Sequence, residues 1–127
     1  MARILVVEDD AIMRPTLRDL LQLEGHTVLT ATDGLEALAI LGDTQIDLVI
    51  TDFAMPQLDG LGLVSALRAD PRLSSLPVIM FTASGTPGVC DAAFEAGANE
   101  FLLRPITPQH LFTSVQRLLP LPAEEET

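Results

Sequence analysis

Acidic residues follow two short apolar runs of this sequence and indicate its chemistry. Residues Glu8–Asp10 come directly after Ile4–Val7, and Asp52 comes directly after Leu48–Thr51. If these runs are neighbouring strands of a parallel sheet, their ends lie about 4.8 Å apart, and Glu8, Asp9 and Asp52 form one cluster. Such carboxylates repel one another unless a cation lies among them. An all-oxygen set suits Mg²⁺, which shares its ligands with phosphate, so the spacing predicts a magnesium site.

Two further polar groups follow later apolar runs. Thr82 comes after Val78–Phe81, and Arg104 comes after Phe101–Leu103. A hydroxyl and a cation that face a carboxylate cluster are the outline of a site for phosphoryl chemistry. Each residue alone is more often a cap or a turn residue, but the convergence of several strand ends favours a functional site.

Other polar residues near these ends have structural interpretations. Asp10 is predicted to be the N-cap of the first helix. Asp59-Gly60 is interpreted as turn chemistry, with the glycine supplying a positive φ. Cys90 is the only cysteine, so no disulfide forms within the chain, and a small helical residue is favoured over a redox thiol.

Apolar runs and helical segments alternate five times along the chain. The runs do not alternate in polarity, as is typical of strands buried on both faces; they are Ile4–Val7, Thr27–Ala31, Leu48–Thr51, Val78–Phe81 and Phe101–Leu103. Start signals (Asp33 with Glu36, Thr86-Pro87, Thr107-Pro108) and stop signals (Gly25, Gly97) bound several of the helices. We therefore predict an α/β fold: a five-stranded parallel sheet of order 2-1-3-4-5, flavodoxin-like and doubly wound as (βα)5.

The charge balance excludes several functions. The 127 residues carry a formal charge of −11, and all seven basic residues are arginine. Nucleic-acid binding and attachment to an anionic membrane both need a basic surface, so neither is expected. The absence of lysine excludes enzymes that need a lysine base or Schiff base. With no signal peptide and no membrane span in the sequence, we expect a cytoplasmic protein.

The ordered motifs of the chain resemble the receiver domain of two-component response regulators. The resemblance covers about residues 3–118, and the chain looks like a single-domain receiver of the chemotaxis type, residues 1–119, followed by a short acidic tail, 120–127. It rests on Ile4–Asp10, Asp47–Asp52 with Met55-Pro56 and Asp59-Gly60, Pro77–Ala83, and Gly97-Ala98 through Arg104-Pro105.

The resemblance implies a phosphoacceptor and a metal site. Asp52 would accept a phosphoryl group from a histidine kinase or a histidine phosphotransfer protein. Asp9, Asp52 and the backbone carbonyl of Ala54 would ligate Mg²⁺, and Glu8 would act through a water molecule. Such a protein catalyses its own phosphorylation and dephosphorylation and is not a turnover enzyme. The cognate kinase stays unidentified.

The resemblance also implies a switch that reads the phosphoryl group. Thr82, Ala83, Phe101, Arg104 and Pro105 occupy the phosphoryl-contact and switch positions, with the side chain of Phe101 following Thr82 and a cis peptide before Pro105. The output would be a downstream protein target bound on the face of the fourth helix, fifth strand and fifth helix. A homodimer is a further possibility.

One position departs from the family pattern. The family places a lysine where this chain has Arg104, and arginine is longer, planar and forked. Either Arg104 does the lysine's work, as the absence of lysine throughout the chain favours, or phosphorylation is weakened. The alternative function is then a receiver-like interaction module that works without phosphorylation.

Two other classes fit the residues less well. A phosphatase with an aspartate nucleophile would need a second aspartate at Ala54, and a flavodoxin-type carrier would need a phosphate loop in place of Glu8–Asp10. Ala54 and Ser84 offer no carboxylate or carboxamide to orient water, so no strong acceleration of dephosphorylation is expected.

Overall fold

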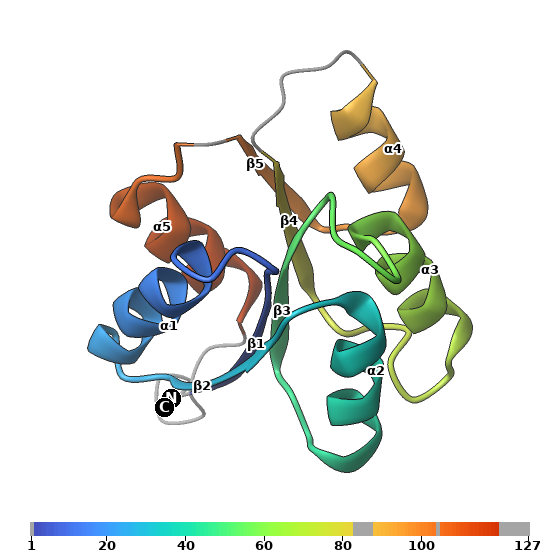
Figure 1. The fold of residues 1–127 in the computed structure, drawn as a ribbon, viewed down its shortest axis with the longest axis horizontal. Coiled ribbons are helices and arrows are strands. Elements are labelled where there is room, and N and C mark those ends of the chain that lie inside the picture. The colour runs from blue at the N-terminus through green and yellow to red at the C-terminus, as the bar shows by residue number, and fades with distance from the viewer. Residues whose placement is uncertain (1, 83–87, 104, 120–127) are drawn as a thin grey trace, which may run out of the picture.

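A computed structural model describes residues 2–82, 88–103 and 105–119 of the protein. Strands and helices alternate along the chain (Figure 1). The strands are β1 (Arg3–Val7), β2 (Thr27–Ala31), β3 (Leu48–Asp52), β4 (Val78–Thr82) and β5 (Glu100–Leu103). The helices are α1 (Met13–Leu23), α2 (Gly34–Asp43), α3 (Gly60–Ala69), α4 (Val89–Ala96) and α5 (Pro108–Leu118). Each predicted strand is confirmed to within one residue at either end.

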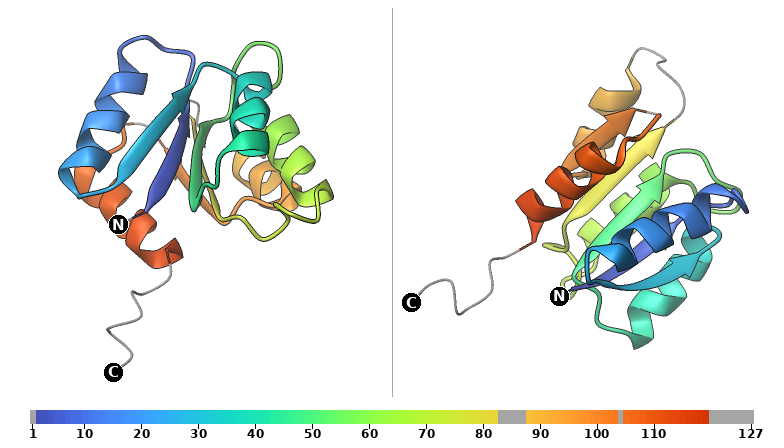
Figure 2. Two further views of the ribbon diagram at one scale, coloured as in Figure 1. Left: turned by 90° about the horizontal axis from the view of Figure 1, so that it is seen from below. Right: turned by 90° about the vertical axis from the view of Figure 1, so that its left-hand side faces the viewer.

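The strands form one parallel sheet in the order β2-β1-β3-β4-β5, which confirms the predicted topology. Helices α1 and α5 cover one face of the sheet, and α2, α3 and α4 cover the other (Figures 1 and 2). This arrangement places the carboxyl ends of β1 and β3 side by side at the centre of the sheet, where the strand order reverses.

Alternate residues of each central strand supply two separate cores. Leu5, Val49 and Met80 pack on the side of α2, α3 and α4. Ile4, Ile50 and Phe81 pack against α1 and α5. The prediction that every strand is buried on both faces is wrong for β2 and β5, which are half-buried. They are the edges of the sheet, where no further strand covers them.

The helix boundaries follow side-chain caps. The Asp33 carboxylate accepts a hydrogen bond from the Glu36 amide at 2.8 Å, as predicted, but the Glu36 carboxylate reaches the amide of Thr32 rather than that of Asp33. The Thr107 hydroxyl caps α5 by accepting from the His110 amide at 3.2 Å. Gly25 and Gly97 follow α1 and α4 with φ of 91° and 117°, confirming both stop signals. The predicted Thr86-Pro87 start signal and the 120–127 tail lie outside the described residues.

The guanidinium of Arg68, at the end of α3, joins several segments at the amino edge of the sheet. Its Nε and Nη2 both donate to the carbonyl oxygen of Gly97, at 3.1 and 2.8 Å. Nη1 donates to the carbonyls of Ser74 and Leu76, at 3.0 and 2.8 Å, and Nη2 also donates to the Asn99 side chain at 3.0 Å. These acceptors are uncharged, and burial lowers the pKa of Arg68. One side chain thus ties α3 to the loop before β4 and to the turn before β5.

We expect His26 to make the stability of the fold weakly dependent on pH. Its Nδ1 accepts a hydrogen bond from the Ala2 amide at 3.3 Å, and burial is the main cause that lowers the pKa of His26 below 6.5. The folded protein therefore favours the neutral ring, and as pH falls below about 6.5 the unfolded chain binds a proton first. We expect the small His26 contribution to be present above that pH and lost on acidification.

Urea unfolding of the wild type and of His26→Gln at about pH 7.5 and about pH 5.5 measures this contribution. The difference between the two proteins should shrink at the lower pH. His110→Gln, which changes an exposed histidine, is the matched control. A difference that grows on acidification would contradict the assignment.

Candidate functional site

Three carboxylates meet where β1 and β3 end. Val7 and Thr51 are paired in the sheet, so the next residues, Glu8 and Asp52, leave adjacent strands at the same level. Carboxylate oxygens of Glu8, Asp9 and Asp52 lie within 4.8 Å of one another. Glu8 and Asp52 are 1% and 8% exposed, whereas Asp9 faces solvent. The predicted cluster is therefore present, with two buried members and one open to solvent.

Backbone contacts orient Glu8 within this cluster. Its amide donates to the carbonyl of Ala31 at 3.0 Å, and its carbonyl accepts from Nη1 of Arg14 at 3.0 Å. Its carboxylate accepts from the Asp10 amide at 3.1 Å. These contacts fix the buried carboxylate at the end of β1.

Asp10 has a structural role beside the cluster. Its carboxylate accepts from the amides of Ile12 and Met13 at 2.7 and 3.1 Å, although the regular helix begins at Met13, with Ile12 in the cap position. The residue therefore caps the turn that leads into α1, two residues before the assigned cap. This differs from the prediction in the boundary but not in the hydrogen bonding.

The donors suit a hard divalent cation. Carboxylate oxygens are the ligands that Mg²⁺ prefers, and two buried carboxylates this close together are disfavoured without a neutralising charge. The exposed Asp9 leaves the cluster open to solvent on one side. Ala54, the predicted source of a carbonyl ligand, lies in the exposed bend two residues after Asp52. The donor set therefore fits magnesium.

The sheet also places two of the predicted switch residues on neighbouring strands, β4 and β5. Thr82 ends β4, next to β3, and is 4% exposed. Phe101 of β5 pairs with Met80, two residues before Thr82, and packs against the core on the α4 side. Paired residues of neighbouring strands point to the same face of a sheet, and so do alternate residues of one strand. Phe101, its partner Met80 and Thr82 therefore lie on the same side of the sheet. Ala83 and Arg104 lie outside the described residues.

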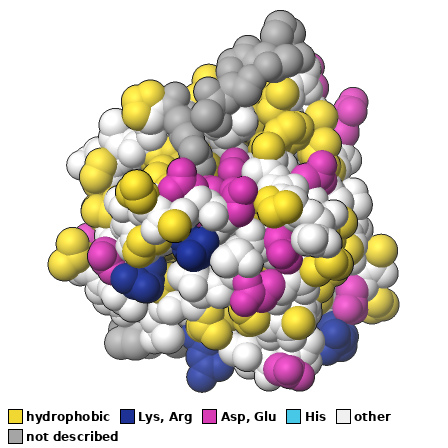
Figure 3. Space-filling model, viewed as in Figure 1, with side chains coloured by type: hydrophobic (Ala, Val, Ile, Leu, Met, Phe, Trp, Pro, Cys, Tyr) yellow, Lys and Arg dark blue, Asp and Glu magenta, His cyan; other side chains and the backbone are white. Residues whose placement is uncertain are grey.

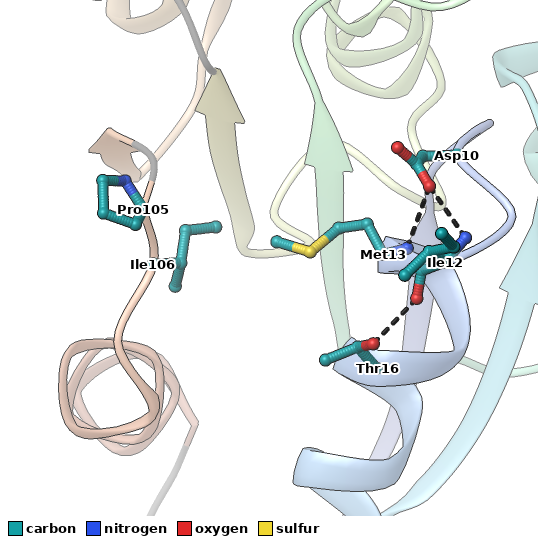
Figure 4. Close-up of a pocket in the computed structure, with 6 residues that line it drawn as sticks. All are labelled: Asp10, Ile12, Met13, Thr16, Pro105 and Ile106. Atoms are coloured by element: carbon teal, nitrogen blue, oxygen red, sulfur yellow. Dashed lines mark hydrogen bonds between the residues drawn. The ribbon is translucent and has the colours of Figure 1, made fainter.

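A small cavity lies next to Asp10, between α1 and the segment before α5. It has a volume of about 360 Å³ and is lined by Asp10, Ile12, Met13, Thr16, Pro105 and Ile106. The Met13 side chain extends across it towards Ile106 (Figure 4). Ile12 is 79% exposed at its rim. Pro105 is exposed and lines this cavity together with Asp10.

The sequence did not predict two contacts made at the backbone carbonyl of Asp52. The hydroxyl of Thr51 donates to the Asp52 carbonyl at 3.0 Å, and a Cβ on Gly60 would overlap that same carbonyl oxygen. Gly60 is the first residue of α3 and does not have a positive φ, so the predicted turn role is wrong. Asp59 is the N-cap, and the positive φ, 68°, belongs to Gln57. The only sign of the contact at the Asp52 carbonyl in the sequence was Gly60 itself, because the close approach of the two residues depends on the fold.

Acidic side chains gather across the middle of the face seen in Figure 3, with a few basic side chains beside and below them. The sheet has the strand order of α/β proteins that bind ligands at a topological switch point, where the strand order reverses. The buried carboxylates lie at that point, so the chain falls in this class of proteins.

The chain belongs to the response regulator receiver domain family, whose family model matches residues 4–116. It is 37% identical to the chemotaxis protein CheY of Pseudomonas aeruginosa over 117 residues, covering 91% of this chain and 94% of CheY. It is 36% identical over 117 residues to the probable transcriptional regulator ycf27 of Guillardia theta, covering 92% of this chain and 45% of ycf27. The chain thus spans about half the length of the ycf27 relatives.

A solved structure in the same family bears on the metal. The receiver domain of the sensor histidine kinase PA1611 from Pseudomonas aeruginosa has a TM-score of 0.86 and 27% identity, covering 92% of this chain and 96% of that one. That structure is described with a magnesium ion coordinated in its active-site cleft. The protein is therefore a receiver domain of two-component signalling.

Among the described residues, no helix is long and apolar enough to cross a membrane.

Proposed function

We propose that Asp52 accepts a phosphoryl group from a phosphohistidine. The observation that carries this proposal is the cluster of Glu8, Asp9 and Asp52 within 4.8 Å at the carboxyl edge of β1 and β3. One carboxylate oxygen of Asp52 forms the new P–O bond while the P–N bond to the donor imidazole breaks. The electron pair stays on that nitrogen, which then takes up a proton.

Mg²⁺ would be held by Asp9, Asp52 and the carbonyl of Ala54, with Glu8 contributing through a water molecule. When bound, the ion neutralises the carboxylates and the charge on the phosphoryl oxygens. The magnesium ion in the PA1611 receiver domain and the donor set of this chain support the proposal. The burial of Glu8 and Asp52 keeps competing water away from one side of the cluster.

The signal would reach a partner through the face of α4, β5 and α5. Thr82, with Ala83, would contact the phosphoryl group, and Phe101 would follow it from the same side of the sheet. Phe94 and Leu103, 47% and 55% exposed, give this face an apolar surface that a protein target can cover. The phosphoryl donor would be a histidine kinase or a histidine phosphotransfer protein, and we propose that the exchange takes place in the cytoplasm.

Arg104 would contact the phosphoryl group in place of the family's lysine. Since a guanidinium can donate two hydrogen bonds to phosphoryl oxygens, we expect Arg104→Lys to change the phosphorylation rate by less than about threefold. Rates measured with acetyl phosphate at saturating Mg²⁺ check this. A large increase in the lysine variant would show that arginine weakens the site.

Intact-mass measurement after incubation with acetyl phosphate and Mg²⁺ tests the proposal. We expect one added phosphoryl group, and none when EDTA removes the metal. If the mass stays unchanged with Mg²⁺ present, the protein is a receiver-like interaction module that works without phosphorylation.

A further inference from the structure

The segment between β3 and α3 carries Ala54 and is closed by backbone hydrogen bonds. At its start, the Phe53 amide donates to the carbonyl of Phe81 at 2.8 Å. At its end, the Gly60 amide donates back to the carbonyl of Phe53 at 2.9 Å. Residues 53–59 therefore form a loop whose two ends are tied together at the end of the sheet.

A third attachment ties this loop to a different helix. The carbonyl of Leu58 accepts from the amide of Gly34, the first residue of α2, at 3.0 Å. Gly34 is buried, and a Cβ there would lie 2.5 Å from the Leu58 carbonyl oxygen and 2.8 Å from the Leu58 Cβ. Gly34 does not have a positive φ, so close approach, rather than backbone conformation, explains the glycine.

Two other glycines, Gly62 and Gly42, serve as comparisons for Gly34. A Cβ on Gly62 of α3 would meet mainly Cδ1 of Leu58, at 2.5 Å, which is the far end of a flexible side chain. A Cβ on Gly42, in the same helix as Gly34, would meet nothing within 4 Å. Of Gly34, Gly42 and Gly62, only Gly34 is placed so that an added Cβ would meet the backbone of the loop.

We propose that Gly34 is a positioning residue for the metal site, because its contact with Leu58 sets the position of the loop that presents the Ala54 carbonyl. This inference rests on the proposed function, in which that carbonyl is a magnesium ligand. An alanine at position 34 pushes the Leu58 carbonyl away from α2 and stretches the hydrogen bond that anchors the loop. Since Gly60 and Phe53 tie the loop ends, the displacement falls on the residues between them, Ala54 included.

The test is the Mg²⁺ dissociation constant of Gly34→Ala, measured by calorimetry alongside amide chemical shifts across residues 53–60. We expect an approximately tenfold weaker affinity, the scale of changes to groups that orient metal ligands, together with shifts concentrated in this loop. Gly42→Ala should leave both unchanged and raise the urea midpoint. Gly62→Ala should move the Leu58 side chain with less than about a threefold change in affinity.

A second variant keeps the test decisive if Gly34→Ala does not fold. Leu58→Gly removes the side-chain half of the contact and should also weaken Mg²⁺ binding, whereas Leu61→Ala, at a partly buried residue of α3, should not. If the wild type and the Gly34 and Leu58 variants all bind Mg²⁺ equally well, the positioning role of Gly34 is overturned, while the proposed function stands. If the wild type binds no Mg²⁺, the proposed function fails and this inference fails with it.

Discussion

Asp52→Asn is expected to abolish phosphorylation by acetyl phosphate, with a fall in rate of at least about a thousandfold. The amide has nearly the shape of the carboxylate, so the buried site at the end of β3 stays filled. It lacks the anionic oxygen that attacks phosphorus and the charge that a cation neutralises. Intact mass after timed incubation with acetyl phosphate and Mg²⁺ measures the effect.

Asp59→Asn is the matched control for this variant. It makes the same chemical change seven residues later and removes one negative charge from the end of the same loop. Asn is as good a helix cap as Asp, so the hydrogen bond from the Gly62 amide is kept. We expect normal phosphorylation of Asp59→Asn. Retained labelling of Asp52→Asn at the wild-type rate would place the phosphoacceptor elsewhere.

Arg68→Ala is expected to lower the free energy of unfolding by about 2–4 kcal/mol. The variant removes charge-assisted hydrogen bonds to the carbonyls of Gly97, Ser74 and Leu76 and to the Asn99 side chain. Those acceptors lie on separate segments of the chain, so the variant removes the links that hold these segments to α3. Urea unfolding monitored by far-ultraviolet circular dichroism measures the loss.

Two variants separate this effect from simple loss of charge. Arg68→Lys should recover less than half of the lost stability, because one ammonium cannot span acceptors that a planar guanidinium reaches on three nitrogens. Arg72→Ala removes an exposed arginine of the following loop, paired at 3.3 Å with Asp70, and should cost less than about 0.5 kcal/mol. Equal losses for Arg68→Ala and Arg72→Ala would refute the structural role of Arg68.

The fold was predictable because its determinants are local. Apolar runs without alternation gave the strands, and caps such as Asp33 and Thr107 gave the helix starts. The strand order follows from right-handed crossovers together with the resemblance to a known family. The cluster of Glu8, Asp9 and Asp52 was predictable from the same order, since it requires only that β1 and β3 be neighbours.

What the sequence did not reveal depends on contacts between distant segments. Gly60 approaches the Asp52 carbonyl, and Gly34 approaches Leu58, but a glycine in a turn-rich sequence gives no sign of which atom it meets. Arg68 is likewise ordinary in sequence, because its acceptors are backbone carbonyls that carry no residue signature. The half-burial of β2 and β5 is consistent with their edge positions in the predicted order, but their continuous apolar runs did not indicate it.

We expect the phosphorylation of Asp52 to require Mg²⁺. Peptide mapping by mass spectrometry, after incubation with acetyl phosphate and reduction of the acyl phosphate with borohydride, locates the modified residue directly. We expect the reduced residue to be Asp52 and to appear only when Mg²⁺ is present. Modification of another residue, or equal modification of Asp52 in EDTA, would contradict it.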